Sequence, residues 1–168
     1  MKTNRLLLAS GLLASFTALL HTFAGTVEVH VPLLSSTIPR SVSLLIYACW
    51  HLVTVTLILS AVALLWSARR GNSSLAGALP RFISVLWLLF GLVFVGVALV
   101  FSGPATLWVL PQWVLLIPVG ILGLLGDRKR AEGADAEAVE TTAASHVHAG
   151  HDPKEIARHH DTGKDRMF

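Results

Sequence analysis

Charged residues are scarce in this chain of 168 residues, and acidic ones are scarcest of all. Asp, Glu, Lys and Arg make up 14% of the sequence, whereas an ordinary soluble domain has about 25%. Hydrophobic residues reach 54%, and the mean hydropathy is +0.66. This balance excludes a disordered chain, a nucleic-acid-binding arm and an ordinary soluble enzyme.

Cysteine and the common catalytic motifs are also missing. Cys49 is the single cysteine, so no disulfide can form within the chain. The sequence contains no G-x-S-x-G, P-loop, H-E-x-x-H or C-x-x-C pattern. These patterns mark hydrolase nucleophiles, phosphate loops, metalloprotease helices and redox centres. Their absence favours a non-enzymatic protein.

The few charges that are present divide the chain into two parts. Glu28 is the single acidic residue before Asp127, and residues 1–126 carry six Lys or Arg. Residues 127–168 carry seven Lys or Arg and nine acidic residues. The change predicts a membrane domain over 1–126, followed by a polar, His-rich cytosolic tail over 127–168 that is mostly disordered.

Four long apolar stretches occupy the first part. Each is close to the roughly 20 helical residues needed to cross about 30 Å of hydrocarbon. We expect spans at about residues 6–24, 42–66, 82–101 and 107–125. A tight reversal at residues 102–105 makes the last two an antiparallel hairpin. The predicted fold is an all-α integral membrane protein, a four-transmembrane-helix bundle.

The positive residues predict the orientation of these spans, because Lys and Arg in short loops stay on the cytoplasmic side. Arg40 stands alone on one side. The opposite side has eight positive residues: Lys2, Arg5, Arg69, Arg70, Arg81, Arg128, Lys129 and Arg130. We therefore expect a multi-pass protein with both termini cytoplasmic. In size and layout the chain resembles small four-span bacterial membrane proteins, which implies the bacterial inner membrane.

The first span has a second interpretation, a secretory signal peptide cleaved after Ala24. A retained helix is favoured by a small, polar stripe that covers about 100° of its surface. The stripe consists of Ser10, Ala14, Thr17, Ala18 and His21. Small residues and hydroxyl groups on one side are what the inward face of a bundle helix needs.

The fourth span carries two further patterns. Gly120, Gly123 and Gly126 form a ridge of small residues that favours close packing between helices. Pro111 and Pro118 are seven residues apart, so they share a helix face and are expected to bend the span. Because bent spans can line a cavity, an oligomeric channel or transporter is one possible function.

Two histidines lie within the predicted spans, where ionisable residues are costly. His21 and His51 differ in expected depth by about one to two helix turns, so neighbouring antiparallel helices could bring them together. Two facing imidazoles bind a transition metal or a b-type haem. They serve equally well as hydrogen-bonding partners of nearby hydroxyl groups, or as a proton path.

Further candidate metal ligands lie outside the spans. Residues 26–32 alternate between polar and apolar, which predicts an extended segment with Glu28 and His30 on the same side. These two residues, with His21 and His51, would form a carboxylate and imidazole cluster at the outer surface. In the tail, His146, His148 and His151 are a second candidate metal site.

Three functions are compatible with these features. The leading one is a non-enzymatic accessory or scaffold subunit in the lipid bilayer, either a homo-oligomer or bound to a membrane-protein partner. The second is a metal- or haem-binding membrane protein that uses His21 and His51. The third is the oligomeric channel or transporter. Whether the His21 and His51 rings meet is the observation that discriminates best between the first two.

Overall fold

The structure, a computed structural model, describes residues 3–69, 74–101 and 103–149. The described residues are helical apart from short turns, and none of them belongs to a strand. The chain divides into two compact units, Met1–Arg130 and Ala131–Phe168. The first unit contains the apolar helices.

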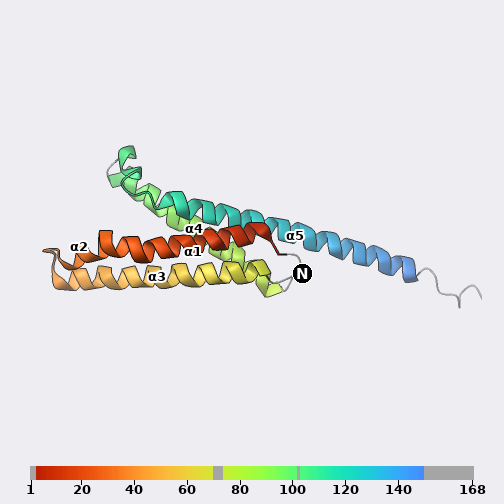
Figure 1. Cartoon of the computed structure of the whole chain (residues 1–168). Helices are drawn as coiled ribbons and strands as arrows, with labels where there is room; N and C mark the ends of the chain where they lie inside the picture. Colours follow the sequence, from red (N-terminus) through yellow and green to blue (C-terminus); the bar gives the residue numbers. More distant parts are fainter. Residues whose placement is uncertain (1–2, 70–73, 102, 150–168) are drawn as a thin grey trace, which may run out of the picture. The chain divides into compact units, whose positions relative to one another are not determined.

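The elements follow one another as hairpins of helices (Figure 1). In chain order they are α1 (Arg5–Gly25), the π-helical turn η1 (Thr26–His30), α2 (Val31–Leu34), α3 (Arg40–Arg69), α4 (Ser74–Phe101), the 3-10 turn η2 (Pro104–Leu107) and α5 (Trp113–Ala149). α1, η1 and α2 together make one uninterrupted helical run, Arg5–Leu34.

Three of these helices are long and apolar enough to cross a membrane: Arg5–Leu34, Arg40–Arg69 and Ala78–Phe101. They contain the predicted spans 6–24, 42–66 and 82–101. The prediction of transmembrane helices is therefore confirmed for these three. The apolar part of α5 is shorter, because Trp113–Gly126 rises only about 20 Å at 1.5 Å per residue before charged residues begin.

The fourth apolar stretch differs from the expected continuous helix over 107–125. After Gly103, whose φ of 82° suits a residue without a side chain, the chain makes η2 and further turns before α5 begins at Trp113. Pro111 lies in these turns and only Pro118 lies inside α5, so the two prolines do not share a helix face. The connection between α4 and α5 is correspondingly longer than the predicted reversal at 102–105.

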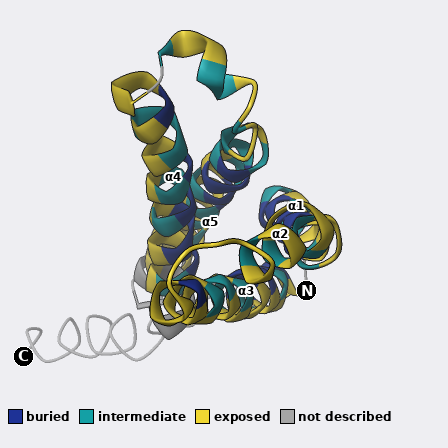
Figure 2. Ribbon diagram, turned by 90° about the vertical axis from the view of Figure 1, so that its left-hand side faces the viewer, coloured by how far each residue is buried: buried dark blue, intermediate teal, exposed yellow. Residues whose placement is uncertain are grey.

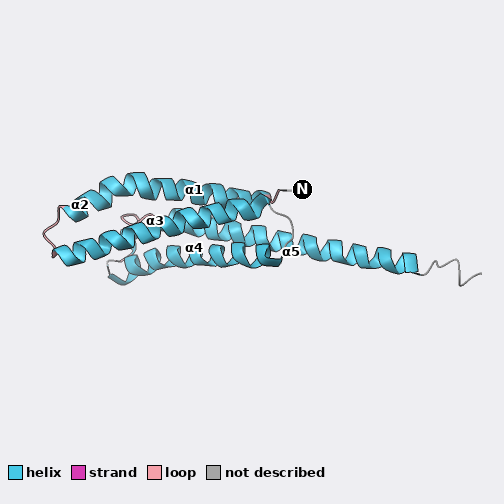
Figure 3. Ribbon diagram, turned by 90° about the horizontal axis from the view of Figure 1, so that it is seen from below, coloured by secondary structure: helices cyan, strands magenta, loops and turns pink. Residues whose placement is uncertain are grey.

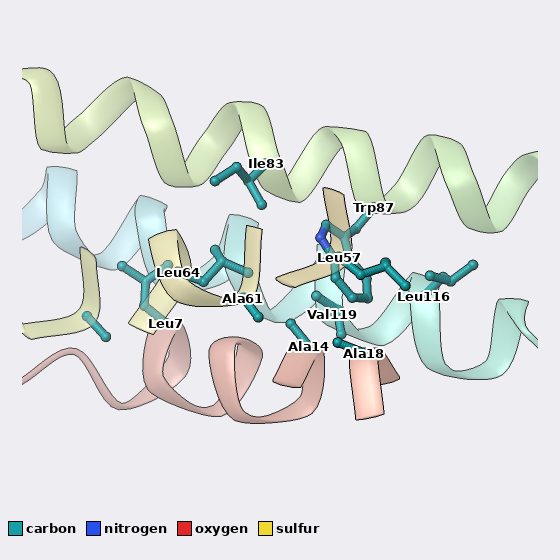
Figure 4. Packing of buried hydrophobic residues seen from close by; sticks show 11 residues of the cluster. Leu7, Ala14, Ala18, Leu57, Ala61, Leu64, Ile83, Trp87, Leu116 and Val119 are labelled. Atoms are coloured by element: carbon teal, nitrogen blue, oxygen red, sulfur yellow. The ribbon is translucent and has the colours of Figure 1, made fainter. Parts of the chain in front are cut away.

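The core forms where α1, α3, α4 and the first part of α5 approach one another, with their buried faces turned inward (Figure 2). Trp87 is its largest member and is 0% exposed. Figure 4 shows how side chains from all four helices meet there. The buried apolar cluster consists of Leu7, Ala14, Ala18, Leu57, Ala61, Leu64, Ala68, Ile83, Trp87, Leu116 and Val119.

The predicted inward stripe of the first helix is confirmed. Ser10, Ala14, Thr17 and Ala18 are all buried, and His21 is half-buried. The Ser10 hydroxyl donates a hydrogen bond of 2.8 Å to the Val119 carbonyl oxygen of α5. α1 runs beside α3 along most of its length (Figure 3).

The glycine ridge of α5 packs inside the bundle. A Cβ on Gly120 would lie 2.6 Å from the Ser84 carbonyl oxygen, and one on Gly126 would lie 2.8 Å from the Leu7 amide nitrogen. At Gly123 the added atom would overlap the Ser84 hydroxyl. The prediction of close helix packing is confirmed, and the surfaces that meet are α4 and α1 of the same chain.

Buried polar contacts connect the helices. Asn4 caps α1, because its side-chain oxygen accepts from the Leu6 and Leu7 amides, each at 3.2 Å. The backbone amide of Asn4 donates a hydrogen bond to the Ala68 carbonyl oxygen at 3.1 Å, and the side-chain Nδ2 donates one to the Gly126 carbonyl oxygen at 2.7 Å. One residue therefore joins the start of α1, the end of α3 and the Gly126 turn inside α5.

The described beginning of the tail is helical, although residues 127–168 were predicted to be mostly disordered. α5 continues as far as Ala149. Ala131–Val139 and its neighbours are almost entirely exposed, as expected for a polar segment without an apolar face. Residues 150–168 lie outside the described part of the chain.

Candidate functional site

The two ends of the first unit differ in the side chains they carry. We call the end with Arg5, Arg69 and Arg128 the arginine end. The opposite end of α1 and α3 carries the three histidines that precede the tail, His21, His30 and His51, and we call it the histidine end. The candidate site lies at the histidine end.

Helical backbone, and not the predicted extended segment, positions His30. Thr26–His30 is a π-helical turn and Val31–Leu34 continues as α-helix, with Pro32 in the first turn of α2, where its missing N–H costs nothing. Helix satisfies its own backbone hydrogen bonds, which favours it beside a membrane. The alternation of residue types in 26–32 was therefore a misleading signal.

The change of conformation separates Glu28 from His30. Residues two apart lie on nearly opposite sides of a helix, whereas they share a side in a strand. Glu28 is exposed and His30 is half-buried. The predicted pairing of this carboxylate with this imidazole on one side is therefore wrong.

Three rings gather where η1 packs against α3. Tyr47 and His51 are four residues apart on one face of α3, with ring centroids 4.5 Å apart. His30 reaches across from η1, with its centroid 4.5 Å from that of Tyr47 and 6.0 Å from that of His51. The two imidazole planes are nearly perpendicular, at 85°. We call His30, Tyr47 and His51 the imidazole cluster.

His21 has a different partner. Its ring stacks on Trp50 with centroids 3.9 Å apart and an interplanar angle of 17°. Gly25 makes room for the indole, because any side chain there would overlap it. The imidazole that faces His51 is thus His30, while His21 belongs to the neighbouring stack.

Two imidazole nitrogens at this end are buried without a hydrogen-bond partner, Nε2 of His21 and Nε2 of His30. Buried polar atoms almost always have a partner, so each of these has an unmet bonding capacity. His51 is exposed. The cluster therefore combines His30, whose Nε2 is buried and has no hydrogen-bond partner, with the exposed ring of His51.

Cys49, which was not among the predicted ligands, is exposed on α3, about 160° around the helix from His51. Among the described residues, no group of three or more His, Cys, Asp or Glu is placed to hold a metal ion. In the tail, His146 and His148 fall within α5, and His151 lies outside the described residues.

Sequence reasoning missed two members of this region. Tyr47 shares a face of α3 with His51, but its contact with both imidazoles also depends on His30 coming from a helical η1. Trp50 could not be predicted as a partner of His21 either, because the two rings meet only through the packing of α1 on α3. The i, i+4 spacing of Tyr47 and His51 was the one local signal available.

Comparison with protein-family models, curated proteins and solved structures gave no match. The site is accordingly interpreted from its own residues.

Proposed function

We propose that the chain is a four-span integral membrane protein with both termini in the cytoplasm, acting as a non-enzymatic accessory or scaffold subunit of a membrane complex. The arginine end would face the cytoplasm, because its Lys and Arg residues are the ones retained there. The bacterial inner membrane is the proposed location.

Packing supports a first span that is retained. Cleavage after Ala24 would remove Leu7, Ser10 and Ala14, which are all 0% exposed in the core. It would also remove the hydrogen bonds of Asn4 and leave the Gly126 surface of α5 without its partner. Such losses would expose small and polar surface that has no use outside a bundle.

A fourth crossing is supported by the charged residues that follow Gly126. Counted from Trp113 to Arg130, α5 rises about 27 Å, close to the roughly 30 Å of hydrocarbon. Arg128 and Lys129 are exposed, and long basic side chains can bury their stems while the charge reaches the interface. Trp113 would anchor the other end.

This topology is tested by thiol labelling of intact cells. In a Cys49→Ser background, an impermeant maleimide should label Ser36→Cys in the connection between α2 and α3. It should label Thr141→Cys in α5 only after the cells are broken. Labelling of both positions in intact cells would refute the proposed orientation.

The observation that carries the subunit role is an unfilled notch at Gly96. Among the glycines of residues 5–69, 78–101 and 113–126, it alone has no atom within 4 Å of the place where a Cβ would stand. Its helical neighbours on both sides are exposed aliphatic side chains: Leu92, Val93, Leu99 and Val100. A glycine surrounded by such side chains lets another helix approach closely, and no described residue of this chain packs there.

The test compares Gly96→Leu with Val97→Leu, an exposed neighbour on the same helix. In native gels of mild-detergent extracts, the wild type and Val97→Leu should migrate as one complex larger than the monomer. Gly96→Leu should shift to lower mass with an unchanged thermal midpoint. A complex that survives in Gly96→Leu, or a wild type that is monomeric, would rule the role out.

The glycine ridge of α5 is not offered as a partner surface. Gly120, Gly123 and Gly126 are already in contact with α4 and α1 of the same chain, so enlarging them should unfold the bundle before it affects assembly. The metal or haem hypothesis requires a separate argument, because His30 and not His21 faces His51.

A further inference from the structure

None of the three rings of the imidazole cluster belongs to the buried apolar cluster, whose α3 members run from Leu57 to Ala68. We propose that His30 and His51 bind one transition-metal ion between them, and that this ion is monovalent copper. The inference does not depend on a partner subunit, so its failure and that of the subunit role are separate outcomes.

Distance is the first support. Metal to imidazole-nitrogen bonds of about 2.0–2.1 Å place the centres of two rings on one ion about 5–6 Å apart. The His30 and His51 centroids are 6.0 Å apart. Their planes are nearly perpendicular, at 85°, so the two rings do not stack on each other.

Unmet bonding capacity is the second support. Nε2 of His30 is buried and has no hydrogen-bond partner. A bond to a metal ion would satisfy this nitrogen, which otherwise carries the cost of lost hydration. His51 is exposed, so the other described residues do not fully cover its ring.

The site also lies where an ion from water can reach it. The helical run Arg5–Leu34 is about 45 Å long at 1.5 Å per residue, which exceeds the hydrocarbon thickness of about 30 Å. Its last turns, including His30, therefore extend to the aqueous boundary if the run begins at the opposite interface.

The ligand chemistry selects the ion. Imidazole suits zinc, copper, iron and nickel, and copper is the one of these ions that proteins also bind in a monovalent state. No carboxylate or thiolate of the described residues joins the pair. Two neutral ligands cancel no charge, so a monovalent ion leaves the least uncompensated charge at the site.

A haem fits the same pair poorly. In a bis-histidine haem the porphyrin plane lies between the two axial imidazoles. Here the Tyr47 ring contacts both imidazoles, with centroids 4.5 Å from each. This ring occupies one flank of the gap between the imidazoles, where a porphyrin would have to lie.

The experiment must separate this site from the tail histidines. We would use the full-length chain in detergent with the five tail histidines replaced by Ala: His146, His148, His151, His159 and His160. Cuprous ion, kept reduced by ascorbate, and Zn²⁺ are added separately, and bound metal is measured after gel filtration. One copper per chain is expected, with weaker binding of zinc.

Three variants locate the ion. His30→Ala and His51→Ala should each weaken copper binding at least tenfold, and His51→Gln should do the same while preserving size and the near-UV circular dichroism. His21→Ala is the matched control and should bind copper as the parent does. Tyr47→Phe should also retain the ion, because the proposal uses two imidazoles only.

X-ray absorption of the copper-loaded chain should show two nitrogen neighbours at about 2.0 Å. Absence of bound copper, equal loss in His21→Ala, or retention in both His30→Ala and His51→Gln would overturn the site. Tighter binding of zinc than of copper would overturn the choice of ion, and loss in Tyr47→Phe would overturn the two-imidazole ligand set.

Discussion

The arginine end and the histidine end are built from the same helices, yet they pack differently. Toward the arginine end, α5 approaches α1 and α4 so closely that Gly120, Gly123 and Gly126 have no room for a side chain. Toward the histidine end, Ser43 is the one buried residue in the stretch of α3 from Arg40 to Thr56. One end is held by contact between backbones, and the other carries rings with unmet polar atoms.

The difference shows how the two tasks of a small membrane protein can be separated along its length. Lipid gives apolar side chains no reason to leave it, so small residues and hydrogen bonds must hold helices together. These are concentrated in the arginine half. Fewer such contacts hold the histidine half together, and this half carries the imidazole groups that can bind a ligand.

The largest loss of stability should come from removing the core tryptophan, Trp87. Trp87 is 0% exposed and donates a 2.9 Å hydrogen bond to the Ser60 hydroxyl, so Trp87→Ala should lower the free energy of unfolding by about 3–5 kcal/mol. Trp108, at 78% exposed, is the matched control, and its loss should cost less than about 0.5 kcal/mol. Equal effects in detergent unfolding curves would show that Trp87 does not hold a packed core together.

A smaller effect should follow from one added methyl group in the ridge. Gly123→Ala would force the Ser84 hydroxyl to move, at a cost of about 1–3 kcal/mol for overpacking. Gly96→Ala adds the same group in open space, where alanine's helix preference makes the change neutral or slightly favourable. Thermal midpoints of the two variants should therefore shift in opposite directions or leave Gly96→Ala unchanged. An unchanged thermal midpoint in Gly123→Ala would show that the Ser84 side chain does not pack against Gly123.

The smallest expected effect compares two buried serines. Ser10 bonds to the Val119 carbonyl at 2.8 Å in the arginine half, and Ser43 bonds to the Leu33 carbonyl at 3.3 Å in the histidine half. Ser10→Ala should cost about 0.6 kcal/mol, the average for hydrogen bonds between membrane helices. Ser43→Ala should cost less, because its bond is longer. If Ser43→Ala lowered the free energy of unfolding more than Ser10→Ala in the same assay, the arginine half would not be the more tightly held one.

Much of the arginine half was predictable because its signals are local. The stripe from Ser10 to Ala18 and the ridge from Gly120 to Gly126 follow from helical periodicity alone. Their burial agrees with the prediction. What periodicity could not give was the identity of the partners: the ridge of α5 is filled by Ser84 and Leu7 of the same chain.

The histidine half was harder to predict because its signals compete. The alternation in residues 26–32 favours a strand, whereas continuity with α1 favours a helix, and the helix prevails. A competition between turn and helix led to the second error, in which the fourth helix was predicted to begin at 107 instead of Trp113. Turn and helix propensities are close in value there, so neighbouring structure decides.

By itself, the sequence determined that the protein is made of apolar helices long enough for a membrane, that positive charge gathers at one end of them, and that His21, His30 and His51 accompany the other. Composition and periodicity carry this information because each acts through neighbouring residues on one helix. Only the tertiary structure decided that His30 and not His21 faces His51. That pairing depends on the rotation and depth of one helix against another, which no local pattern in either helix records.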